Sequence, residues 1–237
     1  MTNNSFSIAS FNVHWGGVTT AGAPYDLLDA VRALDADVVV LQEAWWPLGD
    51  EDALHHGLRD DGYTLVDHRL DHGLRRGRHR FDTEHTGDWG ILIASRLPVT
   101  VLPSLSVGTV PGDPILEREV AHLELDCIGT TVDLIAPHLS AVPMVGPITQ
   151  LRRLRPQLPM ARPTIIAGDL NISPHIARAV LGWHWRPAVT GFTWPAGRRW
   201  CQIDHIFTSG SARASDGHVH ARNGSDHHPI RAVITID

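Results

Sequence analysis

Lysine is absent from this chain of 237 residues, and all twenty of its basic residues are arginine. The absence excludes Schiff-base chemistry and any other mechanism that uses a lysine amine as its nucleophile. Cysteine is almost as scarce. Cys127 and Cys201 each lie within an apolar stretch, so we expect two buried thiols rather than a disulfide framework or a zinc site.

The sequence also lacks long apolar runs and a targeting segment. No stretch is long enough to span a membrane, and the first residues, MTNNSF, contain neither a basic region nor an apolar core. We therefore expect a cytoplasmic protein with no secretory signal and no membrane anchor. Its net charge of −6 argues against a protein that coats nucleic acid, although a local basic patch could still bind phosphate.

The remaining composition is that of an ordinary globular protein. Hydrophobic residues make up 43% of the chain and charged residues 19%, which is typical of a soluble domain with an ample core. We see no linker, low-complexity tract or break in composition, so we expect one domain over residues 1–237. Nothing in the sequence points to an obligate protein partner.

Strand-like and helix-like segments alternate along the chain. Apolar, β-branched runs predict strands over residues 6–13, 37–43, 90–95, 119–125, 130–138, 163–169, 202–209 and 229–237. Helical spacing predicts helices over residues 24–34, 148–158 and 173–182, the last with Ser173 as its N-cap. Residues 35–43 and 161–169 both follow a helix and end an apolar strand with an acid. This echo indicates two similar halves in an α/β fold with helices outside packed sheets.

Polar side chains interrupt the pattern where strands end, which is where α/β proteins gather their ligands. They are Asn12, Glu43, His138, Asp169, Asn171, Asp204, Asp226 and His227. Taken singly, most have ordinary explanations: Asn12 fits a turn and His138 fits a satisfied core histidine. Asp204 is more telling, because an acid among apolar neighbours must be paired if it is buried. Together, these carboxylates and amides suit Mg²⁺ or Mn²⁺ better than zinc.

Seven short motifs carry a resemblance to a known family. In chain order they are FNVHW, VVVLQE, GILIASRLPV, APHLS, IIAGDLN, QIDHIF and SDHHPI. Together they resemble the motifs of the endonuclease/exonuclease/phosphatase superfamily, over residues 6–236. The resemblance implies a four-layered α/β sandwich, with two packed mixed sheets flanked by helices.

The resemblance also implies roles for the polar residues around a metal. Glu43 would be the main metal carboxylate, with Asn12 nearby and Asp226 helping to hold the ion or its water. Asp169 would orient or deprotonate the attacking water, and Asn171 would hold a phosphate oxygen. The expected reaction is in-line attack of water on a phosphoester.

Further roles follow from the same resemblance. Asp204 would hydrogen-bond His227, and His227 would either contact the scissile phosphate or act as general base. His138 would contact the phosphate or help the leaving group. Arg118 matches an arginine that is common in the family just before the strand predicted here over residues 119–125, and we expect it to bind substrate.

The two adjacent histidines near the end of the chain differ in expected role. Pro229 biases His228 toward an extended backbone, on which neighbouring side chains point to opposite sides. Only one of the pair should therefore face the carboxylates, and geometry alone does not choose between them. In the family pattern it is His227, directly after Ser-Asp.

The substrate stays open, because the motifs mix branches of the family. GDLNISP resembles the exonuclease III-like branch, whereas PHLS and HWGG depart from it. We favour a nuclease for DNA or RNA over a hydrolase of small-molecule or lipid-headgroup phosphoesters, and over a catalytically silent binding module. Arg75, Arg76 and Arg78, in a basic cluster over residues 69–80, would bind a phosphate backbone unless they form a solvated face. The basic residues at 152–155 carry the same two alternatives.

Eight tryptophans add a hint about the substrate. Trp15, Trp45 and Trp46 closely follow Asn12 or Glu43, so we expect all three at the rim of the site. There they would stack on bases or wall a pocket for an apolar small molecule. The late tryptophans Trp183, Trp185, Trp194 and Trp200 are expected in the core.

Overall fold

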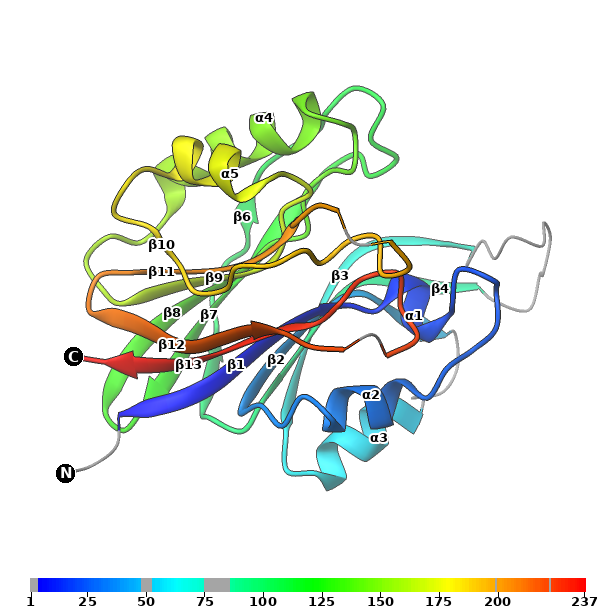
Figure 1. The fold of residues 1–237 in the computed structure, drawn as a ribbon, viewed down its shortest axis with the longest axis horizontal. Coiled ribbons are helices and arrows are strands. Elements are labelled where there is room, and N and C mark those ends of the chain that lie inside the picture. Colours follow the sequence, from blue (N-terminus) through cyan, green and yellow to red (C-terminus); the bar gives the residue numbers. More distant parts are fainter. Residues whose placement is uncertain (1–3, 48–52, 75–85, 199, 222) are drawn as a thin grey trace.

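Two mixed β-sheets face each other in the computed structural model, which describes residues 4–47, 53–74, 86–198, 200–221 and 223–237 (Figure 1). The strand order is β12-β13-β1-β2-β4-β3 in one sheet and β10-β11-β9-β8-β7-β5 in the other, where β6 also pairs with β7. The first sheet comprises β1 (Ser5–Asn12), β2 (Val38–Pro47), β3 (Thr64–Leu74), β4 (Thr86–Ser95), β12 (Ala212–Val219) and β13 (Ile230–Ile236). The second comprises β5 (Val99–Val101), β6 (Leu105–Ser106), β7 (Glu119–Cys127), β8 (Thr130–Ala136), β9 (Thr164–Asp169), β10 (Arg186–Pro187) and β11 (Asp204–Ser209).

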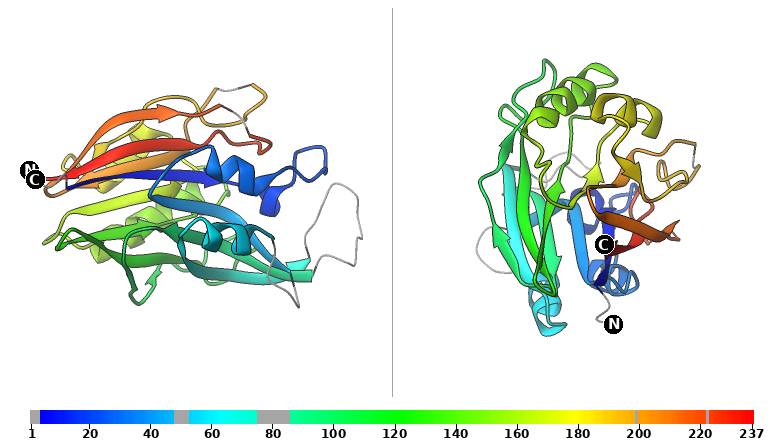
Figure 2. Two further views of the ribbon diagram at one scale, coloured as in Figure 1. Left: turned by 90° about the horizontal axis from the view of Figure 1, so that it is seen from below. Right: turned by 90° about the vertical axis from the view of Figure 1, so that its left-hand side faces the viewer.

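Helices cover the outer faces of both sheets, so the fold has four layers (Figure 2). The helices in chain order are α1 (His14–Gly17), α2 (Leu27–Arg32), α3 (Ala53–Asp60), α4 (Val145–Leu154), the short 3₁₀ helix η1 (Arg155–Gln157) and α5 (Pro174–Leu181). Helices α2 and α3 pack on the first sheet, and α4 and α5 on the second. The expected four-layered α/β sandwich is confirmed. None of the helices in the described ranges is long and apolar enough to cross a bilayer.

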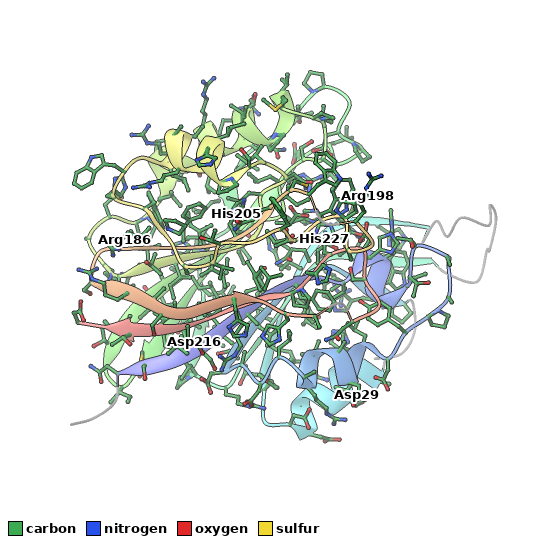
Figure 3. All side chains as sticks on the ribbon, viewed as in Figure 1. Asp29, Arg186, Arg198, His205, Asp216 and His227 are labelled. Carbon is green, nitrogen blue, oxygen red and sulfur yellow. The ribbon has the colours of Figure 1, made fainter. Side chains whose placement is uncertain are left out.

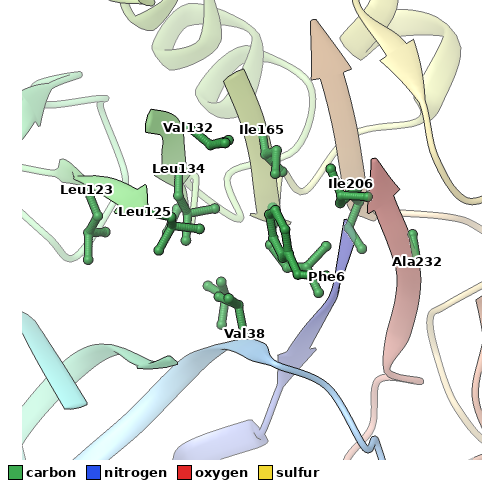
Figure 4. Packing of buried hydrophobic residues seen from close by; sticks show 14 of the residues in the cluster. Phe6, Val38, Leu123, Leu125, Val132, Leu134, Ile165, Ile206 and Ala232 are labelled. Atoms are coloured by element: carbon green, nitrogen blue, oxygen red, sulfur yellow. The ribbon is translucent and has the colours of Figure 1, made fainter. Parts of the chain in front are cut away.

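The central core lies between the two sheets, where alternate strand residues point toward each other (Figure 4). Val38 of the first sheet and Leu123, Leu134 and Ile165 of the second are completely buried there. Full burial of each such side chain stabilises the fold by about 1.5–3 kcal/mol. Two further cores lie between each sheet and its helices. This packing holds the strand ends, and the polar residues on them, in fixed positions.

Each half of the sandwich contains one parallel strand pair. Strands β1 and β2 are parallel and are joined through α2, and β8 and β9 are parallel and are joined through α4. The other pairings are antiparallel. The echo between residues 35–43 and 161–169 corresponds to β2 and β9, the second strand of each parallel pair, and the two-half interpretation therefore fits the structure.

Several element boundaries differ from the sequence prediction. The helix expected over residues 24–34 is shorter, because the Asp26 carboxylate caps it by accepting a hydrogen bond from the backbone N–H of Asp29 (2.9 Å). Ser173 does lie at the N-cap of α5, but its side chain makes no capping hydrogen bond. The sequence prediction missed β3 and β12, whose polar residues hide the strand pattern, and it also missed α3 and the short strands β5, β6 and β10. Cys127 is a buried free thiol as expected, whereas Cys201 is only half-buried.

Candidate active site

The site lies toward the end of the sandwich remote from the two chain termini, where Figure 3 labels His227. Glu43 enters it at a bulge in β2. The pairing of β2 with β4 shifts register between Gln42 and Ala44, and Glu43 adopts a φ of 60°. A bulge redirects the side chain of the extra residue, and its left-handed backbone is costly for a residue other than glycine. The strain is thus located at the carboxylate expected to bind metal.

The segment that follows β1 forms a left-handed turn. His14, Trp15, Gly16 and Gly17 all have positive φ angles, between 48° and 91°. The turn brings the Trp15 backbone N–H to the Glu43 carboxylate, to which it donates a hydrogen bond of 3.0 Å. A Cβ on Gly16 would lie only 2.4 Å from the Cβ of Trp45, so glycine is needed there for space as well as for conformation.

Asn12 links the carboxylate at the bulge of β2 to the carboxylate that ends β9. Its buried amide nitrogen donates to Glu43 Oε1 and to Asp169 Oδ2, both at 3.1 Å. Its amide oxygen accepts from the backbone N–H of His14 (3.0 Å). In this orientation Asn12 holds the carboxylates of Glu43 and Asp169 together. That Asn12 itself binds the metal stays a prediction.

Asp169 lies between two histidines. Its Oδ2 is 3.8 Å from His138 Nε2 and 3.9 Å from His227 Nε2, and its Oδ1 accepts from the backbone N–H of Asn171 (2.8 Å). Burial, together with the negative charge of Asp204, raises the pKa of Asp169 to about 7. Asp169 can therefore exchange a proton near neutral pH. Asn171 uses one amide N–H on the Leu139 carbonyl (2.9 Å), and its second N–H is the group that would reach a phosphate oxygen.

Asp204 and His227 form a buried hydrogen-bonded pair, as the sequence predicted. His227 Nδ1 lies 2.9 Å from Asp204 Oδ2, and this leaves Nε2 facing Asp169. Burial disfavours the imidazolium, but the charge of Asp204 and its hydrogen bond outweigh burial and raise the pKa of His227 to about 10. Ser225 links His227 to Asn12, since its hydroxyl accepts a hydrogen bond from the His227 backbone N–H and donates one to the Asn12 carbonyl.

His228 points away from this cluster. Its Nδ1 lies 2.9 Å from the His220 carbonyl and its Nε2 lies 3.3 Å from the Ala196 carbonyl. The backbone N–H of His228 donates to the Thr193 carbonyl (2.8 Å). The prediction that only one of the two histidines faces the carboxylates is confirmed, and it is His227.

His138 is held by Arg118 through its backbone. Arg118 donates to the His138 carbonyl (2.7 Å) and makes two hydrogen bonds, of 3.1 and 2.9 Å, to the buried carboxylate of Asp113. Burial and the nearby charges of Arg118 and His227 hold the pKa of His138 well below its usual range, so the ring is neutral. Arg118 thus positions His138. Its expected contact with substrate stays a prediction.

Asp226 is oriented by a residue whose role the sequence prediction missed. The Trp194 indole N–H donates to Asp226 Oδ2 (3.3 Å), and Asp226 Oδ1 lies 4.0 Å from His227 Nε2. No local signal marked this contact, because Trp194 and Asp226 are 32 residues apart. Trp194 was expected in the core, but it is half-buried at the site.

The donor set fits a divalent cation. Asp169, Asp204 and His227 each offer one ligand atom, and these atoms lie within 4.8 Å of one another. In the described part of the chain, Oδ1 of Asp204 and Oδ1 of Asp226 are buried and accept no hydrogen bond. Buried carboxylate oxygens without partners need compensating charge, and oxygen-rich sites of this kind suit hard cations.

A cavity of about 850 Å³ opens beside Glu43 and His138. Trp15 and Trp45 line it, as expected, and Trp89 adds a third indole. The expectation for Trp46 is wrong, because its ring turns to the other face of β2 and packs in the core beneath α2 and α3.

The late tryptophans separate in the same way. Trp185 is fully buried in the core between the second sheet and its helices, as expected. Trp183 and Trp200 are 84% and 64% exposed, so their assignment to the core is wrong. Similar sequence surroundings do not show which indole meets a neighbouring element.

The basic clusters are placed only in part. Arg75, Arg76 and Arg78 lie outside the described residues. On α4, Arg152 is exposed, and Arg153 donates to the carbonyls of Val107 (3.0 Å) and Thr109 (2.8 Å). Arg153 therefore ties α4 to the loop before β7.

Comparison with known proteins agrees with the geometry. The sequence model of the Endonuclease/Exonuclease/phosphatase family matches residues 9–227. No curated protein matches the chain. Three similar solved structures come from Beutenbergia cavernae DSM 12333, Bacteroides thetaiotaomicron and Caenorhabditis elegans.

The three structures share the fold over nearly all of this chain. The Beutenbergia endonuclease/exonuclease/phosphatase is 22% identical, with a TM-score of 0.70 over 98% of this chain and 72% of its own. The Bacteroides mannosyl-6-phosphatase is 16% identical, with a TM-score of 0.64 over 98% and 100%. The truncated Caenorhabditis TDP2 is 16% identical, with a TM-score of 0.63 over 98% of each chain. At such low identities the similarity supports the fold alone.

Proposed function

This chain belongs to the endonuclease/exonuclease/phosphatase family, and from that membership we propose that it is a divalent-metal-dependent phosphoester hydrolase formed by one domain over residues 1–237. Members of the family are phosphoester hydrolases and typically need a divalent metal. The observation that carries the proposal is the cluster around Asp169, which Asn12 ties to Glu43 and which two histidines approach within 4 Å. A cytoplasmic location remains a prediction from the sequence.

The protonation states support different roles for the three central groups. Asp169, with a pKa of about 7, suits the residue that orients and deprotonates the attacking water. His227, with a pKa of about 10, is an imidazolium at neutral pH and suits a donor to a phosphate oxygen. This favours the phosphate-contacting role for His227 over the general-base role. Neutral His138 suits a single hydrogen bond to the phosphate or to the leaving oxygen.

Metal chemistry would complete the site. A divalent cation held by Glu43, with Asp226 holding it or its water, would stabilise charge on the phosphate oxygens during attack. Asn12 would keep Glu43 and Asp169 at a fixed separation, and Trp194 would keep Asp226 turned toward the cluster. Catalysis would then rest mainly on positioning and electrostatics.

The choice of substrate depends on charge near the site. A nuclease needs unpaired cations along the nucleic-acid backbone, and the arginines expected to supply them lie outside the described residues. Among the described residues that line the cavity, the one arginine is Arg118, and Asp113 already pairs with it. This observation favours the second candidate, a hydrolase of small phosphoesters, over the nuclease.

One assay panel tests both candidates. Plasmid, abasic duplex, single-stranded RNA and phosphomonoesters that include inositol phosphates are incubated with Mg²⁺ or Mn²⁺. Chelation by EDTA should abolish the turnover of any substrate. Strong turnover of a small phosphoester with inert nucleic acids would reject the nuclease, and the reverse pattern would reject the small-phosphoester hydrolase. No metal-dependent turnover of any phosphoester would argue against the proposed function itself.

His228→Ala is expected to keep most of the activity, within about threefold of wild type, because its ring hydrogen-bonds backbone carbonyls outside the carboxylate cluster. The measurement is kcat and KM on the best substrate of the panel, with thermal unfolding followed in parallel. Some loss of stability is expected, since a buried ring is removed. A folded but inactive His228→Ala protein would contradict the assignment of His227 as the catalytic histidine.

A further inference from the structure

The cavity beside Glu43 and His138 is larger than a phosphate needs. Its volume of about 850 Å³ falls in the range of drug-sized ligand sites. Glu43 and His138 lie in its lining, whereas Asp169, Asp204 and His227 do not. The cavity therefore adjoins the cluster at Glu43 and His138.

Aromatic side chains from three different elements form much of the wall. Trp15 comes from the left-handed turn α1, Trp45 from β2 and Trp89 from β4. Trp45 is held firmly, because a Cβ on Gly16 or on Gly87 would collide with its side chain at 2.4 or 2.9 Å. Trp89 packs against the His138 ring, with 5.2 Å between ring centroids. Indoles fixed in this way present flat apolar surface next to the reacting phosphate.

Further apolar lining comes from two loops. Pro114 and Ile115 belong to the loop before β7, and Val142 and Pro143 to the loop before α4. The lining also includes the Arg118–Asp113 pair, whose charges cancel. The walls therefore offer little to a charged or heavily hydroxylated group, which would lose its hydration there without gaining partners.

The charges at the cavity oppose a second phosphate. Asp71 lies at the exposed edge of the lining, and the neighbouring His72 ring is paired with Asp88 at 2.7 Å. Within the described lining, Asp71 is a carboxylate that no arginine of that lining pairs. A polyanionic chain entering along this wall would meet negative charge, whereas an uncharged group would not.

From these walls and charges we infer that the cavity binds an uncharged, ring-bearing apolar group that is esterified to the phosphate held at Glu43 and His138. The inference rests on the proposed hydrolase function and specifies its substrate class. The organic group would stack on the indoles of Trp15, Trp45 and Trp89 while its phosphate lies at the cluster. The apolar group would raise kcat/KM through binding energy remote from the reacting bond.

Matched substrates test this inference. 3-Phenylpropyl phosphate and propyl phosphate have the same P–O–CH₂ bond and differ only in a remote ring, and their methyl diesters form a second pair. We expect kcat/KM to be about 10- to 100-fold higher for the ring-bearing member, the gain that burial of a phenyl ring supplies. Values within about twofold of each other in both pairs would overturn the inference.

Variants locate the effect in the cavity. Val142→Arg and Ala141→Arg place a cation and a polar chain in the wall, and the phenylpropyl-to-propyl ratio should fall to about 1–3 in both. Ala141 is exposed, so its variant tests the inference even if Val142→Arg folds poorly. Val101→Arg makes the same change at a valine on β5 that is 61% exposed and does not line the cavity, and it should keep the wild-type ratio. A ratio that falls equally in Val101→Arg would contradict the location.

A binding measurement separates failure of the subsite from failure of the proposed function. 4-Phenylbutylphosphonate and butylphosphonate are not hydrolysed, and their affinities can be measured by calorimetry with the metal present. Binding at least about tenfold tighter for the phenyl compound supports the subsite even if no phosphoester is turned over. Equal affinities overturn the subsite, even if hydrolase activity is found. Tighter binding of single-stranded oligonucleotide than of either phosphonate would also overturn it, in favour of a nucleic-acid groove.

Discussion

Replacing His227 with alanine is expected to lower kcat for phosphoester hydrolysis by about 100- to 10,000-fold, the range for loss of a positioned proton donor or acceptor. The ring is buried, its Nδ1 is 2.9 Å from Asp204 and its Nε2 faces Asp169 at 3.9 Å. Alanine would remove both contacts. The measurement is kcat under saturating substrate and metal, on the best substrate of the panel. Residual activity within tenfold of wild type would contradict a catalytic role for His227.

Two companion variants give this result its meaning. The kcat of Asp204→Asn should lie between those of His227→Ala and wild type, because the substitution changes the partner of His227 Nδ1 without removing the ring. His228→Ala should stay near wild type, since it removes a neighbouring ring of the same kind outside the cluster. The order of the three activities, rather than one inactive variant, distinguishes a chemical role for His227 from general damage to the last loop.

Glu43→Gln is expected to weaken Mn²⁺ binding by about 100-fold or more and to remove activity at physiological metal concentrations. Loss of residues that merely support a metal ligand already costs 10- to 100-fold in affinity, so loss of the main carboxylate should cost at least as much. Glutamine keeps the size of the side chain and can still accept from Asn12 and the Trp15 backbone N–H. Mn²⁺ affinity is measured by electron paramagnetic resonance, without substrate.

The same measurement decides between two positions for the ion. The ligand atoms of Asp169, Asp204 and His227 lie close enough together to bind a cation themselves. If the ion binds there, His227→Ala will weaken Mn²⁺ binding and Glu43→Gln will not. If the ion binds at Glu43, the reverse holds. Glu117→Gln, a charge change at an exposed position before β7, serves as the control and should leave affinity unchanged.

The strand pattern and the polar strand ends were predictable because both are local signals. Apolar runs such as residues 37–43 and 163–169 report burial on both faces of a strand, and each ends with an acid, one at the bulge of β2 and one at the end of β9. The chain carries its motifs in the order of the family, so the four-layered fold followed from resemblance. Polar, exposed strands such as β12 carry no such signal and were missed.

The direction of single side chains was less predictable, because it depends on which neighbouring element a residue meets. Trp45 and Trp46 are adjacent, yet one lines the cavity and the other packs beneath the helices. The period of two along a strand predicts that adjacent side chains point to opposite faces of the sheet, but not which of them points to the cavity. Trp194, likewise, was indistinguishable from a core tryptophan until the last loop brought Asp226 to its indole N–H.

The sequence by itself determined most of the strands, several of the helices and the polar residues near the strand ends, and it predicted a hard cation, since all of these depend on residue type and spacing. Only the tertiary structure decided how these residues meet. It joins Asn12 to Asp169 across 157 positions of the chain and turns His227 toward Asp204 while His228 faces backbone carbonyls. It also pairs Arg118 with Asp113. The physical reason is that the charge, burial and pKa of each group depend on neighbours that only the packing of the two sheets brings together.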